Sequence, residues 1–126
     1  MKNIPNLFFV TAAVFALIGM GWGIQMSATQ DHSLSPAHGH LNLIGFVVMA
    51  VYGGYYALTP HAASAVLARL HYLLSLAAVV VLVPGIVMAL TAQGEALAKI
   101  GSILALLSMA IFLFVVIRNG VGQREV

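Results

Sequence analysis

Four long runs of apolar residues follow one another along the chain, separated by short polar segments. A helix needs roughly 20 apolar residues to cross the hydrocarbon core of a bilayer. The runs are apolar on most faces, whereas an amphipathic helix lying on a membrane surface would show a broad polar stripe. We therefore expect an all-α integral membrane protein with four transmembrane helices, forming a single transmembrane domain over residues 1–126. The expected helices cover residues 5–26, 36–58, 65–90 and 96–117.

The composition indicates the same class of protein. Of the 126 residues, 62% are hydrophobic and 6% are charged, whereas roughly a quarter of an ordinary soluble domain is charged. So few charges could not cover a soluble surface, and lipid has to take their place. The formal charge of +2 and the absence of a basic run give no indication of nucleic acid binding. The absence of cysteine excludes disulfides, thiolate metal sites and covalently attached haem.

The positive charges predict how the helices are directed across the membrane. With an even number of spans, both termini and the second loop lie on the same side. The charged residues of that side are Lys2, Arg69, Arg118 and Arg124, against Glu125. The other side has Lys99, with Asp31 and Glu95. Because lysine and arginine accumulate on the cytoplasmic side of membrane proteins, we expect both termini to be cytoplasmic.

Two histidines lie at the start of the second expected helix, in the sequence Ser-Pro-Ala-His-Gly-His-Leu-Asn of residues 35–42. Ser35 is expected to cap this helix, with Pro36 as its first residue. Two residues along a helix correspond to a rotation of about 200°, so the imidazoles of His38 and His40 should point to nearly opposite sides. They cannot easily chelate one metal ion together. Each can serve its own site, or both can contribute to a site shared between subunits. Asn42, one turn after His38, is a candidate to hold a ring N–H or the edge of a cofactor.

The other candidate residues carry weaker signals. His71, near the start of the third helix, could bind a second metal or relay protons, but an interfacial histidine that pairs with loops or lipid phosphate is the favoured interpretation. His32 follows Asp31 and could support a metal site, although a solvated loop is favoured. Aromatic residues are expected mainly in belts at the membrane interfaces: Trp22, Tyr52, Tyr55 and Tyr56.

The sequence Ala-His-Gly-His-Leu-Asn-Leu of residues 37–43, continuing to Tyr-Gly-Gly-Tyr-Tyr at residues 52–56, resembles a helix of subunit I of the haem–copper oxidases. The whole chain is similar to small bacterial four-helix proteins described as oxidase subunit I-like. In the oxidases, the two histidines of a His-x-His motif bind different haems on opposite faces of one helix. The resemblance implies that His38 and His40 are axial ligands of haem b iron, that Asn42 lies beside the cofactor, and that the chain belongs to a bacterial inner membrane.

The resemblance also implies an assembly. Oxidase subunit I has twelve helices in three arcs of four, which a homotrimer of this chain would reproduce. Each haem would lie between neighbours, bound by His40 of one copy and His38 of the next. Two histidine ligands leave no open position for oxygen, which favours electron transfer or redox sensing with an unidentified donor and acceptor. The third helix has no second histidine pair, so we do not expect an oxidase-type copper site or complete oxygen reduction by this chain alone.

Two other functions remain open on the sequence alone. Copper or zinc could bind near the outer surface through Asp31, His32, His38 and His40, because imidazole is a good ligand for both metals. Alternatively, the chain could be an accessory subunit without a cofactor. It would then bind a larger membrane complex through its glycine-rich helix faces, which permit close contact between helices.

Overall fold

A computed structural model describes residues 3–124, and its regular structure there is entirely helical. Four helices are long and apolar enough to cross a membrane, as the hydrophobic pattern predicts. α1 covers Ile4–Thr29, α5 covers Val66–Leu90 and α6 covers Ala96–Asn119. The second long helix has three parts, and a short helix follows it: α2 (Ser35–His40), the π-helical segment η1 (Leu41–Val48), α3 (Met49–Leu58) and then α4 (Pro60–Ala63).

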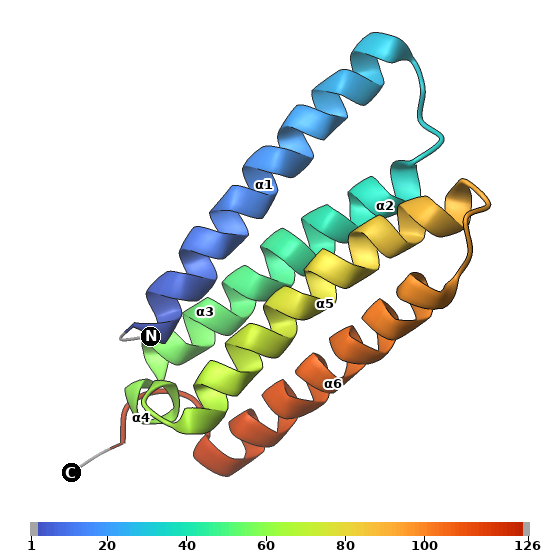
Figure 1. The fold of residues 1–126 in the computed structure, drawn as a ribbon. Coiled ribbons are helices and arrows are strands. Elements are labelled where there is room, and N and C mark those ends of the chain that lie inside the picture. The colour runs from blue at the N-terminus through green and yellow to red at the C-terminus, as the bar shows by residue number, and fades with distance from the viewer. Residues whose placement is uncertain (1–2, 125–126) are drawn as a thin grey trace.

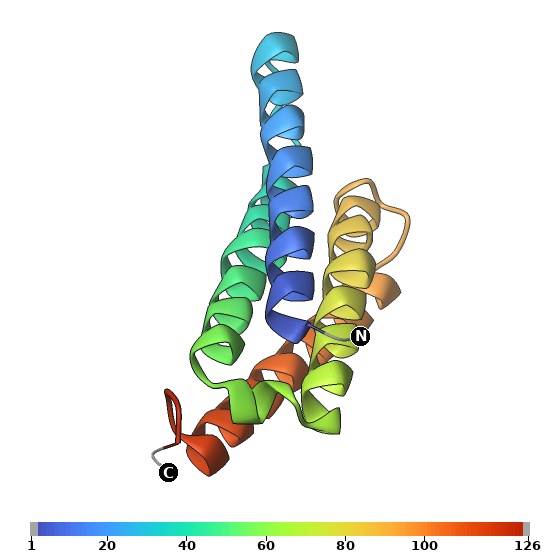
Figure 2. The same ribbon diagram turned by 90° about the vertical axis from the view of Figure 1, so that its left-hand side faces the viewer.

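The four long helices alternate in direction and form a bundle (Figure 1). α1 packs along η1 and α3, α6 packs along α5, and α1 and α6 lie at opposite edges of the bundle (Figures 1 and 2). The start of α1, the end of α6 and α4 lie together at one end, which we call the α4 end. The opposite end carries the loops around residues 30–34 and 91–95 and the start of α2, and we call it the His40 end.

The second long helix begins one residue earlier than expected. The carbonyl of Leu34 accepts the first hydrogen bond of the helix, from the N–H of His38 at 3.1 Å, so Leu34 is the capping residue. The expectation that Ser35 caps the helix is wrong. Its hydroxyl donates instead to the carbonyl of His32 at 2.8 Å and closes the turn that precedes the helix. Pro36 still lies in the first turn, where its missing N–H costs little.

α5 and α6 approach each other closely because glycines lie at their contact. A Cβ atom on Gly101 would lie 2.5 Å from the Cα of Leu82, and one on Gly85 would lie 2.5 Å from the backbone nitrogen of Ala98. No real side chain tolerates such distances from backbone atoms. In lipid, small residues stabilise helix pairs because they let the backbones come into van der Waals contact. α5 also continues through Pro84 to its end at Leu90.

The best-packed part of the molecule is a cluster of rings near the α4 end, which we call the aromatic cluster. Phe8, which has no exposed surface, lies at its centre, with its ring 5.7 Å from that of Tyr56 and 5.1 Å from that of Tyr72. Ring pairs at these separations attract one another beyond simple burial. The cluster joins all four long helices through Phe8 of α1, Tyr52, Tyr55 and Tyr56 of α3, His71 and Tyr72 of α5, and Phe112 of α6.

Candidate functional site

His38 lies against the neighbouring helix of its own chain. Its Nε2 atom is 2.9 Å from the carbonyl oxygen of Gly19 on α1, and its ring meets the ring of Trp22 edge-on at 5.8 Å. A carbonyl oxygen can only accept, so Nε2 must carry the proton and donate. In the neutral imidazole the lone pair is then on Nδ1. In this conformation Nε2 is therefore occupied, and His38 could bind a metal through this atom only after its ring turns away from Gly19.

Asn42 and the glycines of α1 fix this position of the His38 ring. The amide nitrogen of Asn42 lies 3.3 Å from the same Nε2 atom. Because Nε2–H already donates to Gly19 and an amide N–H can only donate, the two groups form a hydrogen bond only when the amide is turned so that its oxygen faces the ring. A Cβ on Gly19 would overlap the Asn42 side chain, and a Cβ on Gly23 would lie 3.2 Å from His38 Nε2. Glycine at these two positions leaves the room that the histidine and the amide use.

His40 has the opposite arrangement and is exposed. Its Nδ1 atom donates to the carbonyl of Pro36, one turn earlier, at 2.7 Å. The lone pair of the neutral ring is therefore on Nε2. A backbone carbonyl that holds Nδ1–H is the usual support of a metal-binding histidine, because it fixes both the tautomer and the direction of the ring. A Cβ on Gly39 would meet nothing within 4 Å, so the backbone between the two histidines is also open to a ligand.

In the loop at the His40 end, Asp31 and His32 do not point to a common centre with the histidine pair. The Asp31 carboxylate accepts from the backbone N–H of Ser33 at 3.0 Å and from its hydroxyl at 2.7 Å. These bonds lower the pKa of the carboxyl below its usual range. His32 is exposed. Within residues 3–124, no three histidine or acidic side chains come together as a metal would require. The described residues of one chain therefore do not bring Asp31, His32, His38 and His40 together into the copper or zinc site that the sequence left open.

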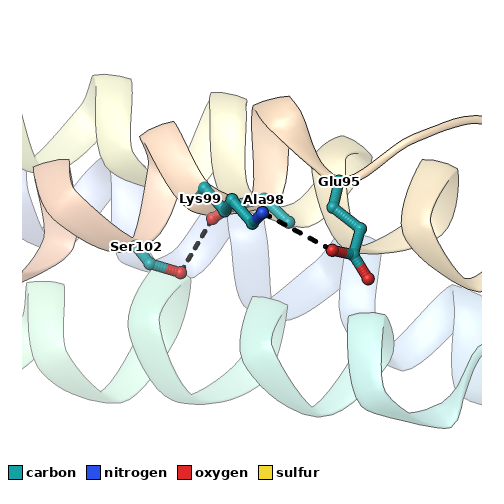
Figure 3. A network of polar contacts seen from close by, with 4 residues as sticks. All are labelled: Glu95, Ala98, Lys99 and Ser102. Carbon is teal, nitrogen blue, oxygen red and sulfur yellow. Dashed lines mark hydrogen bonds and ion pairs between the residues drawn. The ribbon is translucent and has the colours of Figure 1, made fainter.

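Lys99 is a positively charged residue at the His40 end. Its Nζ lies 3.6 Å from a carboxylate oxygen of Glu95, one turn earlier, and both side chains are largely exposed (Figure 3). The hydroxyl of Ser102 bonds back to the carbonyl of Ala98 at 2.8 Å and does not take part in the ion pair. An exposed pair of this kind contributes about 0–1 kcal/mol, so Lys99 is readily available to another anion.

The structure overturns the favoured interpretation of His71. Its side chain has no exposed surface, and Tyr56 rather than a loop or lipid is its partner, with the tyrosine hydroxyl 2.8 Å from Nδ1. The ring lies within the aromatic cluster, 4.4 Å from the ring of Tyr52. Its Nε2 atom has no hydrogen-bond partner. Leaving such a buried polar atom unpaired costs about 1–3 kcal/mol, so this histidine is a costly component of the core.

The tyrosines near His71 also differ from expectation. Tyr52, Tyr55 and Tyr56 are buried, with 2%, 7% and 0% of their surface exposed, and do not form an interfacial belt. Their i, i+3, i+4 spacing places them on one face of α3, where they meet α1, α5 and α6. That spacing was the signal in the sequence that could have identified the cluster. Next to the cluster, a cavity of about 330 Å³ lies between η1, α3, α5 and α6, and its lining is apolar apart from Tyr52, Ser75 and Ser108.

Comparison with known proteins found no matching family model, no similar curated protein and no similar solved structure. The resemblance to oxidase subunit I therefore rests on the motif residues alone.

Proposed function

We propose that this chain is a membrane b-type haem protein of a bacterial inner membrane, and that it works in electron transfer or redox sensing. The observation that carries the proposal is the geometry of His40. Its Nδ1–H is held by the Pro36 carbonyl, which leaves the Nε2 lone pair exposed at the surface of the bundle. A neutral imidazole with this lone pair free is the form that binds haem iron. The bound haem would supply one-electron redox chemistry.

The second axial ligand would come from another copy of the chain. His40 is the exposed histidine of the pair, while His38 faces α1. In the proposed homotrimer, His40 of one copy and His38 of the next would hold the same haem. The His38 ring has to leave the Gly19 carbonyl for this, and the freed carbonyl then needs another donor. This exchange predicts that haem binding and assembly occur together. Lys99, whose own ion pair is exposed, is available to a haem carboxylate at the same end.

The proposed orientation places the His40 end outside the cell and the α4 end in the cytoplasm. Arg69, Arg118 and Arg124 belong to the α4 end, and Lys99 belongs to the His40 end. This distribution is the one that the positive-inside rule associates with cytoplasmic termini. The haem would then lie near the outer leaflet and exchange electrons with a partner on that side.

An absorption spectrum of the purified protein tests the proposal. The wild-type protein, purified after expression with sufficient haem, should show a Soret band and the sharp reduced bands of a low-spin haem. His40→Ala should abolish them, and His38→Ala should remove the low-spin signature. His61→Ala, at the α4 end, is the matched control and should leave the spectrum unchanged. A wild-type protein without a Soret band, even after haem supplementation, would refute the proposal.

Mass and metal measurements separate this function from its alternatives. Light scattering should give three chains per particle when haem is bound, and a monomer or dimer with stoichiometric haem would refute the trimer. Stoichiometric copper or zinc without haem would assign the chain to a metal-binding function. Protein that contains neither cofactor and co-purifies with a larger complex would assign it to an accessory role.

A further inference from the structure

A separate cavity lies at the α4 end, far from the histidine pair. A cavity of about 280 Å³ opens there between α4, the start of α5, the end of α6 and the chain that follows α6. Arg118, Arg124 and His61 line it together with Asn119. The remaining lining is apolar: Ala62, Ala65, Leu67, Ala68 and Val115. The cavity therefore combines two guanidinium groups with a hydrocarbon wall.

Specific contacts fold the end of the chain back to form this cavity. The hydroxyl of Tyr55 donates to the carbonyl of Gly120 at 2.7 Å, and the N–H of Gly122 donates to the hydroxyl of Thr59 at 3.0 Å. Thr59 is completely buried. Gly120 and Gly122 have φ values of 69° and 97°, a backbone conformation that glycine adopts without strain. This reversal after α6 brings Arg124 to the cavity that Arg118 lines.

The positive charges around the cavity favour an anionic ligand. Arg118 and Arg124 line the same small space and repel each other. Within residues 3–124, the only ion pair joins Lys99 and Glu95, and it lies at the opposite end of the bundle. Asp31 also lies at that opposite end. Among residues 3–124, no carboxylate lines the cavity with the two arginines. Such a pair of arginines is typical of phosphate recognition, because guanidinium N–H groups match phosphate oxygens in pairs.

The position of the cavity indicates that the phosphate belongs to a lipid. Arg118 follows lipid-facing residues of α6, with Phe114 50% and Ile117 75% exposed, and Val66 of α5 is 69% exposed beside the cavity wall. The hydrocarbon surface of the bundle therefore continues up to the arginines. Basic pockets between transmembrane helices at the cytoplasmic side bind the headgroups of anionic lipids. We propose that this cavity binds the phosphate group of an anionic phospholipid, with the acyl chains along α5 and α6.

Native mass spectrometry of the detergent-purified chain tests this site independently of haem. Phosphatidylglycerol and phosphatidylcholine are added in equal amounts, and the lipid that stays bound is measured. The wild-type chain should retain phosphatidylglycerol preferentially. Arg118→Gln and Arg124→Gln should each weaken its retention about fivefold, because an arginine near an anionic lipid contributes about 1 kcal/mol. Arg69→Gln is the matched control. It removes the same charge from the same end but from outside the cavity, so it should change retention less than twofold.

Three results would overturn the proposal. The first is equal retention of the two lipids by the wild-type chain. The second is a loss in Arg69→Gln as large as that in Arg118→Gln, which would reduce the effect to general charge. The third is displacement of phosphatidylglycerol by inorganic phosphate at millimolar concentration, with the same dependence on Arg118. That result would assign the cavity to a soluble anion instead of a lipid.

Discussion

The two ends of the bundle carry histidines in opposite surroundings: His40 is exposed and His71 is buried. At the His40 end, the His40 ring is exposed and one backbone carbonyl fixes its tautomer, so that a nitrogen lone pair is presented outward. Toward the α4 end, His71 has no exposed surface, is held by the Tyr56 hydroxyl and has an unpaired nitrogen inside the core. A histidine with an exposed, free lone pair and a histidine built into a core thus occur in one small chain, and their hydrogen-bond partners distinguish them better than their positions in the sequence.

The difference extends to the packing around each histidine. Rings from the three other long helices surround His71, including Phe8 of α1 and Phe112 of α6. Around His38, the contacts come mainly from one neighbouring helix, through Gly19 and Trp22. We therefore expect the aromatic cluster to contribute most to stability, and the side chains at the His40 end to change conformation more easily. Such a change is part of the proposed function, in which the His38 ring must change partners.

The strongest test of this contrast removes the ring at the centre of the cluster. Phe8→Ala should lower the free energy of unfolding by about 3 kcal/mol, because the void loses contacts with Tyr52, Tyr56 and Tyr72 that lipid cannot replace. Phe9→Ala is the matched control, since Phe9 is 45% exposed toward lipid, and it should cost less than about 1 kcal/mol. Titration of the purified protein with SDS measures both. Equal losses would show that the cluster does not dominate stability.

A smaller effect is expected from the buried polar pair. Tyr56→Phe should cost about 2 kcal/mol, because it leaves both ring nitrogens of His71 unpaired. The double variant Tyr56→Phe/His71→Leu removes both polar groups and should recover most of this loss. Tyr52→Phe is the control, since its hydroxyl has only a weak contact with the Met109 sulfur at 3.8 Å. Strictly additive effects in this double-mutant cycle would contradict the assignment of the pair.

The smallest effect is expected at the contact between α1 and α2. Gly19→Ala should displace the Asn42 side chain and cost about 1 kcal/mol, because the new Cβ overlaps the amide. Gly21→Ala, which meets nothing within 4 Å, should change stability by less than about 0.5 kcal/mol. Nitrogen NMR of the histidine rings should show the Nε2–H tautomer for His38 and the Nδ1–H tautomer for His40. In Gly19→Ala, the population of the Nε2–H tautomer of His38 should fall, and the tautomer of His40 should not change. The same tautomer in both wild-type rings would contradict the geometry of the pair.

Several features of the site followed from local sequence alone. The spacing of His38 and His40 predicts that their rings face different surroundings, and one ring does lie against α1 while the other is exposed. The proximity of Asn42 to His38 also followed from helical spacing, and the amide lies 3.3 Å from the ring. Such predictions succeed because a helix fixes the directions of residues within one or two turns, whatever surrounds it.

Other features depend on contacts between distant segments. The burial of His71 requires Phe8 and Tyr56, and the occupation of His38 Nε2 requires Gly19. The π-helical segment η1, immediately after His40, has no signal in the sequence that would have identified it. It changes the number of residues per turn in the middle of the second long helix. Residues before and after η1 therefore do not share the helix face that α-helical spacing would predict for them.

By itself, the sequence determined the class of the protein, the four apolar helices, their alternating direction and the different directions in which the two histidine rings point. Only the tertiary structure decided which apolar and aromatic faces meet one another and which face lipid. The physical reason is that hydrocarbon surrounds these helices on the outside as well as in the core. The polar stripe that marks the outer face of a soluble helix is therefore missing, and the hydrophobic pattern does not distinguish a residue such as Phe8 from its exposed neighbour Phe9.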